Sequence, residues 1–534
     1  MLFLFIKITT HLVHSKYKKV GVLLLTKIFS AATYGVESFL VEVEIDIRPG
    51  LPIFNIVGLP DTAVQESRER VRSAIKNSEF EFPRKRITVN LAPADIKKEG
   101  PIFDLPIALG ILAASNQINK KFLSEIIVLG ELSLDGTVKP ISGVLPISIM
   151  AKEHEKKQMI VPDENANEAG VIKDIEVFPV RSLNEVVGFF NGEHSIEPLD
   201  LDVENIFNKK VFYSSDFEEV RGQEHAKRAL EVAAAGSHNV IMMGPPGSGK
   251  TMLARRLPGI LPSLTLEESI EITKLYSIAN LLPVKESLIT QRPFRAPHHT
   301  ISNVGLIGGG RLPKPGEISL AHNGVLFLDE LPEFSRSALE SLRQPLEDEI
   351  VTISRSLSAM TYKASFILLA SLNPCPCGFY GDPVKECTCS SSQIIKYRSK
   401  ISGPLLDRID IHIEVPRVNC REVMKKPASE KSENIRRRVE FARNIQRQRF
   451  MEKEIYSNSQ MSRKELDQYC HIDDKGKNLI YTAMEKLGLS TRAYDRILKV
   501  SRTIADLDNS VNIDICHLSE AIQYRSLDRR LWLN

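Results

Sequence analysis

A glycine-rich segment offers the clearest chemistry in this chain. Its residues follow the apolar run 240–243 and are Gly244, Pro245, Pro246, Gly247, Ser248, Gly249, Lys250 and Thr251. Glycine has no Cβ, so the backbone N–H groups of such a loop can approach phosphate oxygens closely. A helix that follows the loop would present its positive end to the anion. This is the P-loop pattern. It predicts a nucleoside triphosphate site, with Lys250 at the β- and γ-phosphates and Thr251 on Mg²⁺.

Two adjacent carboxylates end a second apolar run, the four residues 325–328. They are Asp329 and Glu330. Because ligands bind at the carboxyl ends of strands in open α/β sheets, both are expected beside the P-loop. Asp329 would organise Mg²⁺ through water, and Glu330 would orient and activate the attacking water. The alternative is a solvated strand end, which the P-loop upstream argues against.

Three further polar side chains could act on a transferring phosphate. Asn373 follows the apolar strand 366–370 and could hydrogen-bond the γ-phosphate or the attacking water. The alternative for Asn373 is an ordinary strand-ending turn. Arg408 and Arg492 are candidates for an arginine that stabilises charge in the transition state. Each could instead form a surface ion pair, because acidic residues lie near both.

The elements that must position these groups follow from periodicity. Strict alternation over residues 41–47 predicts a half-buried strand. With strands at 87–91, 126–129 and 158–161 and helices at 62–76 and 104–114, it forms an α/β domain over residues 26–190. Arg68, Arg70 and Arg72 in the first helix alternate with Glu66 and Glu69, which predicts a solvated face.

The rest of the chain falls into three parts. Residues 191–210 are polar and contain proline, which predicts a linker. Strands and helices alternate over residues 211–418, the pattern of a mostly parallel sheet. Residues 419–534 are helical, so the fold class is α/β with a helical C-terminal domain. About three domains also agree with a length of 534 residues.

Composition and charge indicate the class of protein and where it acts. Apolar residues make up 43% and charged residues 26%, typical of a globular protein, and the net charge is only +3. Any surface that binds nucleic acid must therefore be local. In residues 1–25 no apolar run reaches the ~18 residues of a membrane helix. We interpret these residues as an extension upstream of the true start, with a weak membrane anchor as the alternative. We expect a cytoplasmic protein without a membrane partner.

Four of the seven cysteines are crowded into one segment. They are Cys375, Cys377, Cys387 and Cys389. Four thiolates at this spacing could hold a structural Zn²⁺ ion in a tetrahedral site. The pairs have C-x-C spacing rather than the commoner C-x₂-C, so free thiols and a redox-active pair remain open alternatives. A disulfide framework is not expected, which indicates a reducing compartment.

Two segments are candidates for DNA contact. One is a flexible basic loop at 305–314 that carries Arg311 and Lys314. The other is a hairpin of residues 350–355 and 360–366, with Arg355 and Lys363. These cations would touch phosphates and give sequence-tolerant, salt-dependent binding. The alternative is a hairpin whose charges are only solvated.

The order of these motifs resembles the AAA+ ATPases of the magnesium-chelatase and MCM branch. Segments 292–299 (RPFRAPHH), 373–378 (NPCPCG) and 490–497 (STRAYDRI) are similar to the YifB/ComM family, and the resemblance runs from about residue 26 to the C-terminus. It implies that 211–418 is the AAA+ core and 419–534 its helical lid. It also implies that Asn373 is sensor 1, Arg408 the finger acting on a neighbour's ATP, and Arg492 sensor 2.

The same resemblance implies a ring, expected to be a homohexamer, that uses ATP and Mg²⁺ to move on single-stranded or branched DNA. Branch migration during DNA uptake and recombination is the function expected of such a DNA helicase. In related ATPases a hairpin like that at 350–366 points into the central pore. The alternative is a magnesium-chelatase-type motor that remodels a protein partner.

Segments 97–104, 130–136 and 140–145 resemble the Lon protease domain. Lon has a serine and a lysine where this chain has Ile102 and Leu145. Neither side chain can act as a nucleophile or a base. A Lon-type protease is therefore a third hypothesis that these two residues oppose.

Overall fold

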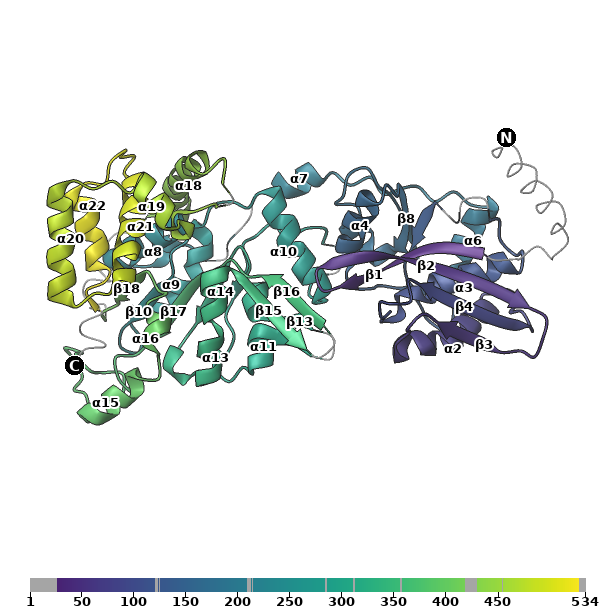
Figure 1. Cartoon of the computed structure of the whole chain (residues 1–534), viewed down its shortest axis with the longest axis horizontal. Coiled ribbons are helices and arrows are strands. Elements are labelled where there is room, and N and C mark those ends of the chain that lie inside the picture. Colours follow the sequence, from purple (N-terminus) through teal and green to yellow (C-terminus); the bar gives the residue numbers. More distant parts are fainter. Residues whose placement is uncertain are drawn as a thin grey trace, which may run out of the picture. The chain divides into compact units, whose positions relative to one another are not determined.

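The chain forms two units, each built on its own sheet (Figure 1). The computed structural model describes residues 26–120, 123, 125–208, 213, 215–283, 286–310, 313–355, 358–417, 430–453 and 455–527. One unit comprises the chain up to Val203 with Leu282–Ser287. The other comprises Glu204–Leu281 and the chain from Leu288 onward.

The N-terminal unit contains a seven-stranded mixed sheet of order β3-β4-β2-β1-β5-β8-β9. Its strands are β1 (Thr26–Tyr34), β2 (Glu37–Arg48), β3 (Phe54–Val57), β4 (Arg86–Ala92), β5 (Ile126–Val128), β8 (Gln158–Pro162) and β9 (Glu176–Val180). Strand β2 pairs antiparallel with β1 and β4, and the other neighbours pair in parallel. A two-stranded ribbon joins β6 (Glu131–Leu132) to β7 (Val138–Lys139). The alternation predicted in β2 is confirmed, because Val41, Val43 and Ile45 are buried.

Among its described residues, this unit contains the two α-helices predicted at 62–76 and 104–114, together with three that were not predicted. The helices of this unit are α2 (Thr62–Asn77), α3 (Asp104–Ala114), α4 (Val144–Glu153), α5 (Ala166–Ala169) and α6 (Leu183–Asn191). Helix α7 (Val203–Asn208) belongs to the second unit except for its first residue. Asp61 caps helix α2, because its side chain accepts a hydrogen bond from the Val64 N–H at 2.8 Å. Helix α3 is buried along its whole length.

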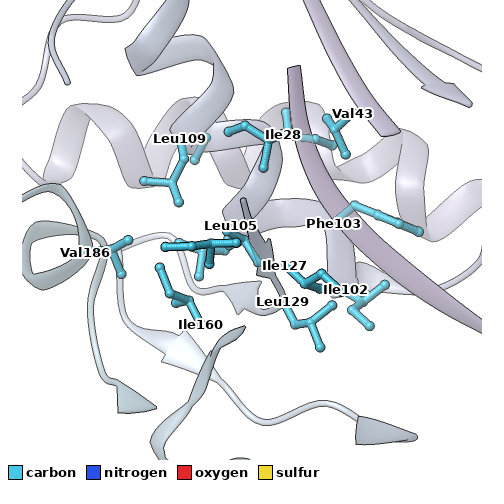
Figure 2. Close-up of a cluster of buried hydrophobic side chains, with 14 of the residues drawn as sticks. Ile28, Val43, Ile102, Phe103, Leu105, Leu109, Ile127, Leu129, Ile160 and Val186 are labelled. Atoms are coloured by element: carbon cyan, nitrogen blue, oxygen red, sulfur yellow. The ribbon is translucent and has the colours of Figure 1, made fainter. Parts of the chain in front are cut away.

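The core of this unit includes the position where Lon has its serine. Ile102 is 7% exposed and lies with Leu129 and Phe103 in the buried cluster of Figure 2. Leu145 is fully buried as well. Both residues therefore act as core side chains in this unit.

The prediction of a solvated arginine face on α2 is wrong for Arg70. Its Nε lies 2.6 Å from Oδ2 of Asp104, a fully buried carboxylate at the start of α3. The sequence pattern failed here because the partner lies on another helix.

The second unit holds a five-stranded parallel sheet of order β11-β14-β17-β10-β18. Its strands are β10 (Val240–Met243), β11 (Phe294–Arg295), β14 (Val325–Leu328), β17 (Ile367–Leu372) and β18 (Ile411–Glu414). Every residue of β10, β14 and β17 is buried, as expected of parallel strands covered on both faces. The predicted parallel sheet is confirmed.

Helices before the C-terminal region connect these strands. They are α8 (Glu224–Gly236), α9 (Lys250–Arg256), α10 (Leu266–Ile278), α11 (Asn303–Ile307), α12 (Glu317–Leu320), α13 (Arg336–Ser341), α14 (Arg343–Asp348), α15 (Ser391–Arg398) and α16 (Gly403–Leu406). Two hairpins project between them: β12 (Gly308–Gly309) with β13 (Lys314–Pro315), and β15 (Ile350–Arg355) with β16 (Ser358–Lys363). The second confirms the hairpin predicted at 350–366.

The C-terminal region is helical, as predicted, and shares a core with the sheet. Its helices are α18 (Ser432–Arg449), α19 (Arg463–Tyr469), α20 (Asp474–Leu487), α21 (Thr491–Leu507) and α22 (Ile515–Gln523). Ile504 and Leu518 belong to the same buried cluster as Ile411 and Ile413 of β18. No helix in the described part of the chain is long and apolar enough to cross a membrane.

Candidate nucleotide site

The P-loop connects the end of β10 to the start of α9. Gly247 and Gly249 have φ angles of +76° and +95°, which side chains with a Cβ rarely adopt. A Cβ on Gly244 would lie 2.1 Å from the Val415 carbonyl oxygen, so this position also has no room for one. The glycines therefore shape a turn that leaves backbone N–H groups open to an anion.

Lys250 is nearly buried at the base of this loop. Its Nζ donates to the carbonyl oxygens of Gly244 at 2.7 Å and Pro245 at 3.0 Å, and to Oδ1 of Asn373 at 3.2 Å. Burial lowers the pKa of Lys250 from its ordinary value, although Asp329 and Glu330 oppose this. The structure thus brings Lys250 to Asn373, two residues predicted from separate motifs.

Thr251 and Asp329 also meet across the site. Thr251 Oγ1 donates to Asp329 Oδ2 at 2.8 Å, and Asp329 Oδ1 accepts a very short hydrogen bond from Ser371 Oγ. Sequence reasoning missed Ser371. Its signal was a polar residue inside the wholly buried run of β17.

Glu330 occupies a left-handed backbone conformation with φ of +54°. Its N–H donates to Asp329 Oδ1 at 3.1 Å and to Ser371 Oγ at 3.3 Å, which holds this conformation. The His299 Nδ1 atom lies 3.8 Å from Glu330 Oε2. The pair His298-His299 could be noticed in the sequence, but the link to Glu330 required the fold.

The two candidate arginines lie in different surroundings. Arg408 donates to the Pro404 carbonyl oxygen at 2.6 Å and makes a very short ion pair with Glu347 of α14. This contact is the main reason why the pKa of Glu347 lies below its ordinary value. Arg492 is exposed on the first turn of α21. Neither arginine has a described contact with the P-loop of the same chain.

The neighbouring Arg496 has a structural role that the sequence did not reveal. Its Nη1 lies 2.8 Å from Oδ1 of the fully buried Asp410, just before β18. Oδ2 of Asp410 accepts the Asn239 N–H at 3.0 Å. This carboxylate therefore joins α21 to the starts of two sheet strands.

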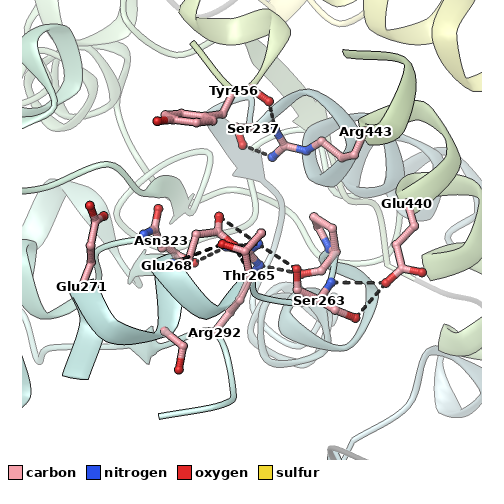
Figure 3. Close-up of polar contacts among 12 residues, drawn as sticks. Ser237, Ser263, Thr265, Glu268, Glu271, Arg292, Asn323, Glu440, Arg443 and Tyr456 are labelled. Carbon is pink, nitrogen blue, oxygen red and sulfur yellow. Dashed lines mark hydrogen bonds and ion pairs between the residues drawn. The ribbon is translucent and has the colours of Figure 1, made fainter. Parts of the chain in front are cut away.

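Arg292 opens the RPFRAPHH segment and anchors it. It donates to the carbonyl oxygens of Pro262 at 2.6 Å and Asn323 at 2.8 Å, and its Nη2 lies 2.9 Å from Glu268 Oε2 (Figure 3). Glu268 in turn completes the capping box of Thr265 at the start of α10. These contacts position the strand β11 that leads to His299.

The candidate DNA contacts are only partly described. Arg311 lies outside the described residues, and Lys314 is exposed on β13. Arg355 ends β15. Lys363 ends β16 and pairs with Glu271 Oε1 at 2.5 Å. Lys314 therefore lies on the hairpin of β12 and β13, and Arg355 and Lys363 lie on the hairpin of β15 and β16. Contact of any of these residues with DNA remains a prediction.

Comparison with known proteins gives the relationship of the whole chain. Residues 216–423 match the family model described as magnesium chelatase, subunit ChlI. Residues 43–165 and 429–525 match models of the same subunit and of its C-terminal part. Competence protein ComM of Haemophilus influenzae is 46% identical over 510 residues, covering 94% of this chain and 98% of that protein. The chain belongs to the ComM/YifB family of magnesium-chelatase-like AAA+ proteins.

Two more relatives cover the whole chain and part of it, respectively. Uncharacterized protein YifB of Escherichia coli is 42% identical over 510 residues, covering 95% of this chain and 98% of that protein. Lon protease 2 of Bacillus subtilis is 32% identical over 149 residues, only about a quarter of either chain. The family and the weaker Lon resemblance named from the motifs are therefore confirmed.

Proposed function

We propose that this protein hydrolyses ATP with Mg²⁺ at the carboxyl edge of its parallel sheet. The observation that carries the proposal is that polar side chains from three strand ends lie close together at this edge. Lys250 reaches Asn373 at 3.2 Å and Thr251 reaches Asp329 at 2.8 Å, so groups that follow β10, β14 and β17 meet. Phosphoryl transfer depends mainly on positioning and charge stabilisation, which such a constellation provides.

The residues present fit the nucleotide and the metal. Ser248 Oγ is buried in the P-loop and has no hydrogen-bond partner among the described residues, so a phosphate oxygen could supply one. Lys250 Nζ already sits among three oxygens, the environment that phosphate oxygens would replace. Thr251 and Asp329 offer the oxygen ligands that Mg²⁺ prefers.

Each side chain then has a defined task. The P-loop N–H groups and Lys250 would bind the triphosphate. Thr251 and Asp329 would hold Mg²⁺, which would neutralise charge on the phosphates. Glu330 orients the attacking water. Asn373 positions the γ-phosphate or that water.

We propose that ATP hydrolysis drives movement of the protein along single-stranded or branched DNA. The protein would act in the cytoplasm as a hexameric ring, in which Arg408 contacts the ATP of a neighbouring subunit. Similarity to a protein named competence protein ComM supports a role in DNA uptake and recombination. Arg408 also supports a shared site, because it has no described contact with its own P-loop. Arg492 acts as a second sensor of the nucleotide.

A second candidate is a motor that remodels a protein partner. It is favoured by the fact that all three matching family models describe magnesium chelatase subunit ChlI. A Lon-type peptidase is opposed by Ile102 and Leu145, which are buried in the core and lack the required chemistry.

ATPase rates measured without DNA, with single-stranded DNA and with forked DNA distinguish these candidates. We expect DNA to raise the rate and the protein to move a branch in a four-way junction. Arg437→Ala controls for loss of one exposed positive charge and should respond to DNA as the wild-type protein does. Arg437 is exposed and, among the described residues, pairs only with Glu433 on its own helix. An ATPase rate indifferent to DNA, with no branch movement, would refute the DNA assignment and favour the protein-remodelling motor.

A mixing experiment tests the shared site directly. Lys250→Ala and Arg408→Ala should each abolish hydrolysis alone. In a ring of randomly mixed subunits, about a quarter of sites would combine an intact P-loop with an intact neighbouring arginine. Activity should therefore return on mixing, by up to about that fraction. If the mixture stays inactive while both variants still assemble, Arg408 does not act on a neighbour.

A further inference from the structure

The four clustered cysteines lie in a long loop beside the nucleotide site. This cysteine loop, residues 374–390, joins Asn373 to α15 and contains no helix or strand. Loops longer than about 12–15 residues without secondary structure are uncommon in folded domains unless something else organises them. Apolar burial does not organise the outer part of this loop, since Val384 is 73% and Tyr380 51% exposed.

The sulfur atoms are gathered instead. Cys375 Sγ lies 3.3 Å from Cys377 Sγ and 3.6 Å from Cys387 Sγ, and the sulfurs of Cys377 and Cys387 are also 3.6 Å apart. All four sulfurs, including that of Cys389, lie within 4.8 Å of one another. A tetrahedral Zn²⁺ with Zn–S bonds of about 2.3 Å would hold its sulfurs about 3.8 Å apart. The three shortest of these distances fall within about 0.5 Å of this value, and no pair of the four sulfurs is more than 4.8 Å apart.

Backbone N–H groups point at the same sulfurs. The Cys377 N–H donates to Cys389 Sγ, the Tyr380 N–H to Cys375 Sγ and the Cys389 N–H to Cys387 Sγ, each at 3.4 Å. Such donors stabilise thiolates, the form in which cysteine binds a metal. They also orient the ligands, as outer contacts do in metal sites.

We propose that Cys375, Cys377, Cys387 and Cys389 bind one structural Zn²⁺ ion that closes the cysteine loop against the P-loop. A tetrathiolate set leaves no open position, so the ion cross-links the chain and takes no part in catalysis. Binding converts the thiols to thiolates and releases their protons.

The cysteine loop packs against both the P-loop and α15. Gly378 has φ of +84° and packs so closely on the P-loop that a Cβ there would lie 2.5 Å from Pro246 Cδ. Arg398 of α15 donates to the Pro374 carbonyl oxygen at 3.1 Å and lies 5.2 Å from the centre of the Tyr380 ring. The ion therefore holds the segment that begins at Asn373 in place between the P-loop and α15.

Zinc content of the purified full-length chain, prepared without metal-affinity resin or chelators, tests the proposal. Elemental analysis should find about one zinc per chain. Cys387→Ser should lower this at least tenfold, whereas Cys516→Ser, which alters an exposed cysteine on α22, should leave it unchanged. Wild-type protein with little zinc, or equal zinc in both variants, would overturn the proposal.

Two further measurements on wild-type protein guard against misfolding of the variant. Cobalt exchanged for zinc should give the visible absorption of tetrahedral Co²⁺–thiolate, and its absence contradicts the site. Chelation should speed tryptic cleavage after Lys385, an exposed residue within the closed loop. Unchanged cleavage would show that the ion does not close the loop.

These readouts do not depend on ATP hydrolysis, so they test the zinc site independently of the proposed ATPase activity. If the native protein instead contains disulfides among these cysteines and no metal, a redox pair replaces the zinc site.

Discussion

Replacing Asp410 by asparagine should loosen α21 from the parallel sheet. Asp410 is fully buried, and it joins Arg496 of α21, at 2.8 Å, to the N–H of Asn239, at 3.0 Å, ahead of β10. The buried His238 lies 3.6 Å away through its Nδ1. Burial alone would raise the pKa of Asp410, but Arg496 and His238 outweigh it, so that the pKa lies below its ordinary value.

The expected cost follows from these contacts. Removing one partner of a buried ion pair costs about 3–5 kcal/mol. The asparagine oxygen can still accept the Asn239 bond, and the Arg496 side chain is 21% exposed, so water can partly solvate it. We therefore expect the lower end, about 3 kcal/mol. Since 1.4 kcal/mol corresponds to a factor of ten, this is about a 100-fold change in local opening.

Hydrogen exchange measured by mass spectrometry on peptides from α21 is the appropriate assay, because a chain of several domains does not unfold in one step. Amides of α21 should exchange about 100-fold faster in Asp410→Asn. Asp495→Asn is the control on the same helix. Asp495 forms a partly exposed pair with Arg463, worth less than about 1 kcal/mol. Equal exchange in the two variants would refute the view that Asp410 anchors α21.

Three other outcomes are expected. Glu330→Gln should retain ATP binding but lower phosphate release at least about 100-fold, because the side chain that activates water is lost. His299→Ala should leave nucleotide affinity unchanged and lower turnover by about tenfold, because its Nδ1 lies 3.8 Å from Glu330 Oε2 and positions that carboxylate. The pKa of Glu271 is lowered to about 2, mainly by its hydrogen bond with His322 and also by Lys363. A lowered carboxyl pKa contributes stability above pH about 4.5 that is lost as pH falls toward 2. Thermal unfolding should therefore show a steeper loss between pH 5 and pH 3 in wild-type protein than in Glu271→Gln.

Matched controls separate these roles from general damage. Glu333→Gln changes an exposed acid close to Glu330 in sequence and should not alter turnover. Normal turnover in Glu330→Gln would remove that residue from the mechanism. His471→Ala controls for His299, since His471 is an exposed histidine between α19 and α20. If Glu271→Gln loses thermal stability between pH 5 and pH 3 as steeply as wild type, carboxylates other than Glu271 cause that loss.

Much of the fold could be predicted because its signals are local. The apolar runs of β10, β14 and β17 and the alternation in β2 depend only on which faces are buried. The hairpin at 350–363 followed from the same pattern. Helix α2 begins at Thr62, as predicted, whereas its capping residue depends on the fold: Asp61 and Thr62 are both good capping residues, and backbone geometry selects Asp61.

The candidate site was predicted in its parts but not in its connections. The motifs named Lys250, Thr251, Asp329, Glu330 and Asn373, since phosphate and Mg²⁺ require particular groups at particular spacings. The support of Asp329 by Ser371 and the approach of His299 to Glu330 were not predicted. Each depends on how neighbouring strands align, and strand register is set by the packing of the whole sheet.

The sequence by itself therefore determined the family, the two sheets and the chemical groups offered to a nucleotide. The tertiary structure decided which groups face one another: Arg70 with Asp104, Asp410 with Arg496, and four cysteines within 4.8 Å. The physical reason is that short-range periodicity specifies which face of an element is buried. Contacts between residues far apart in the chain arise only when those faces pack together and bring particular side chains within hydrogen-bonding distance.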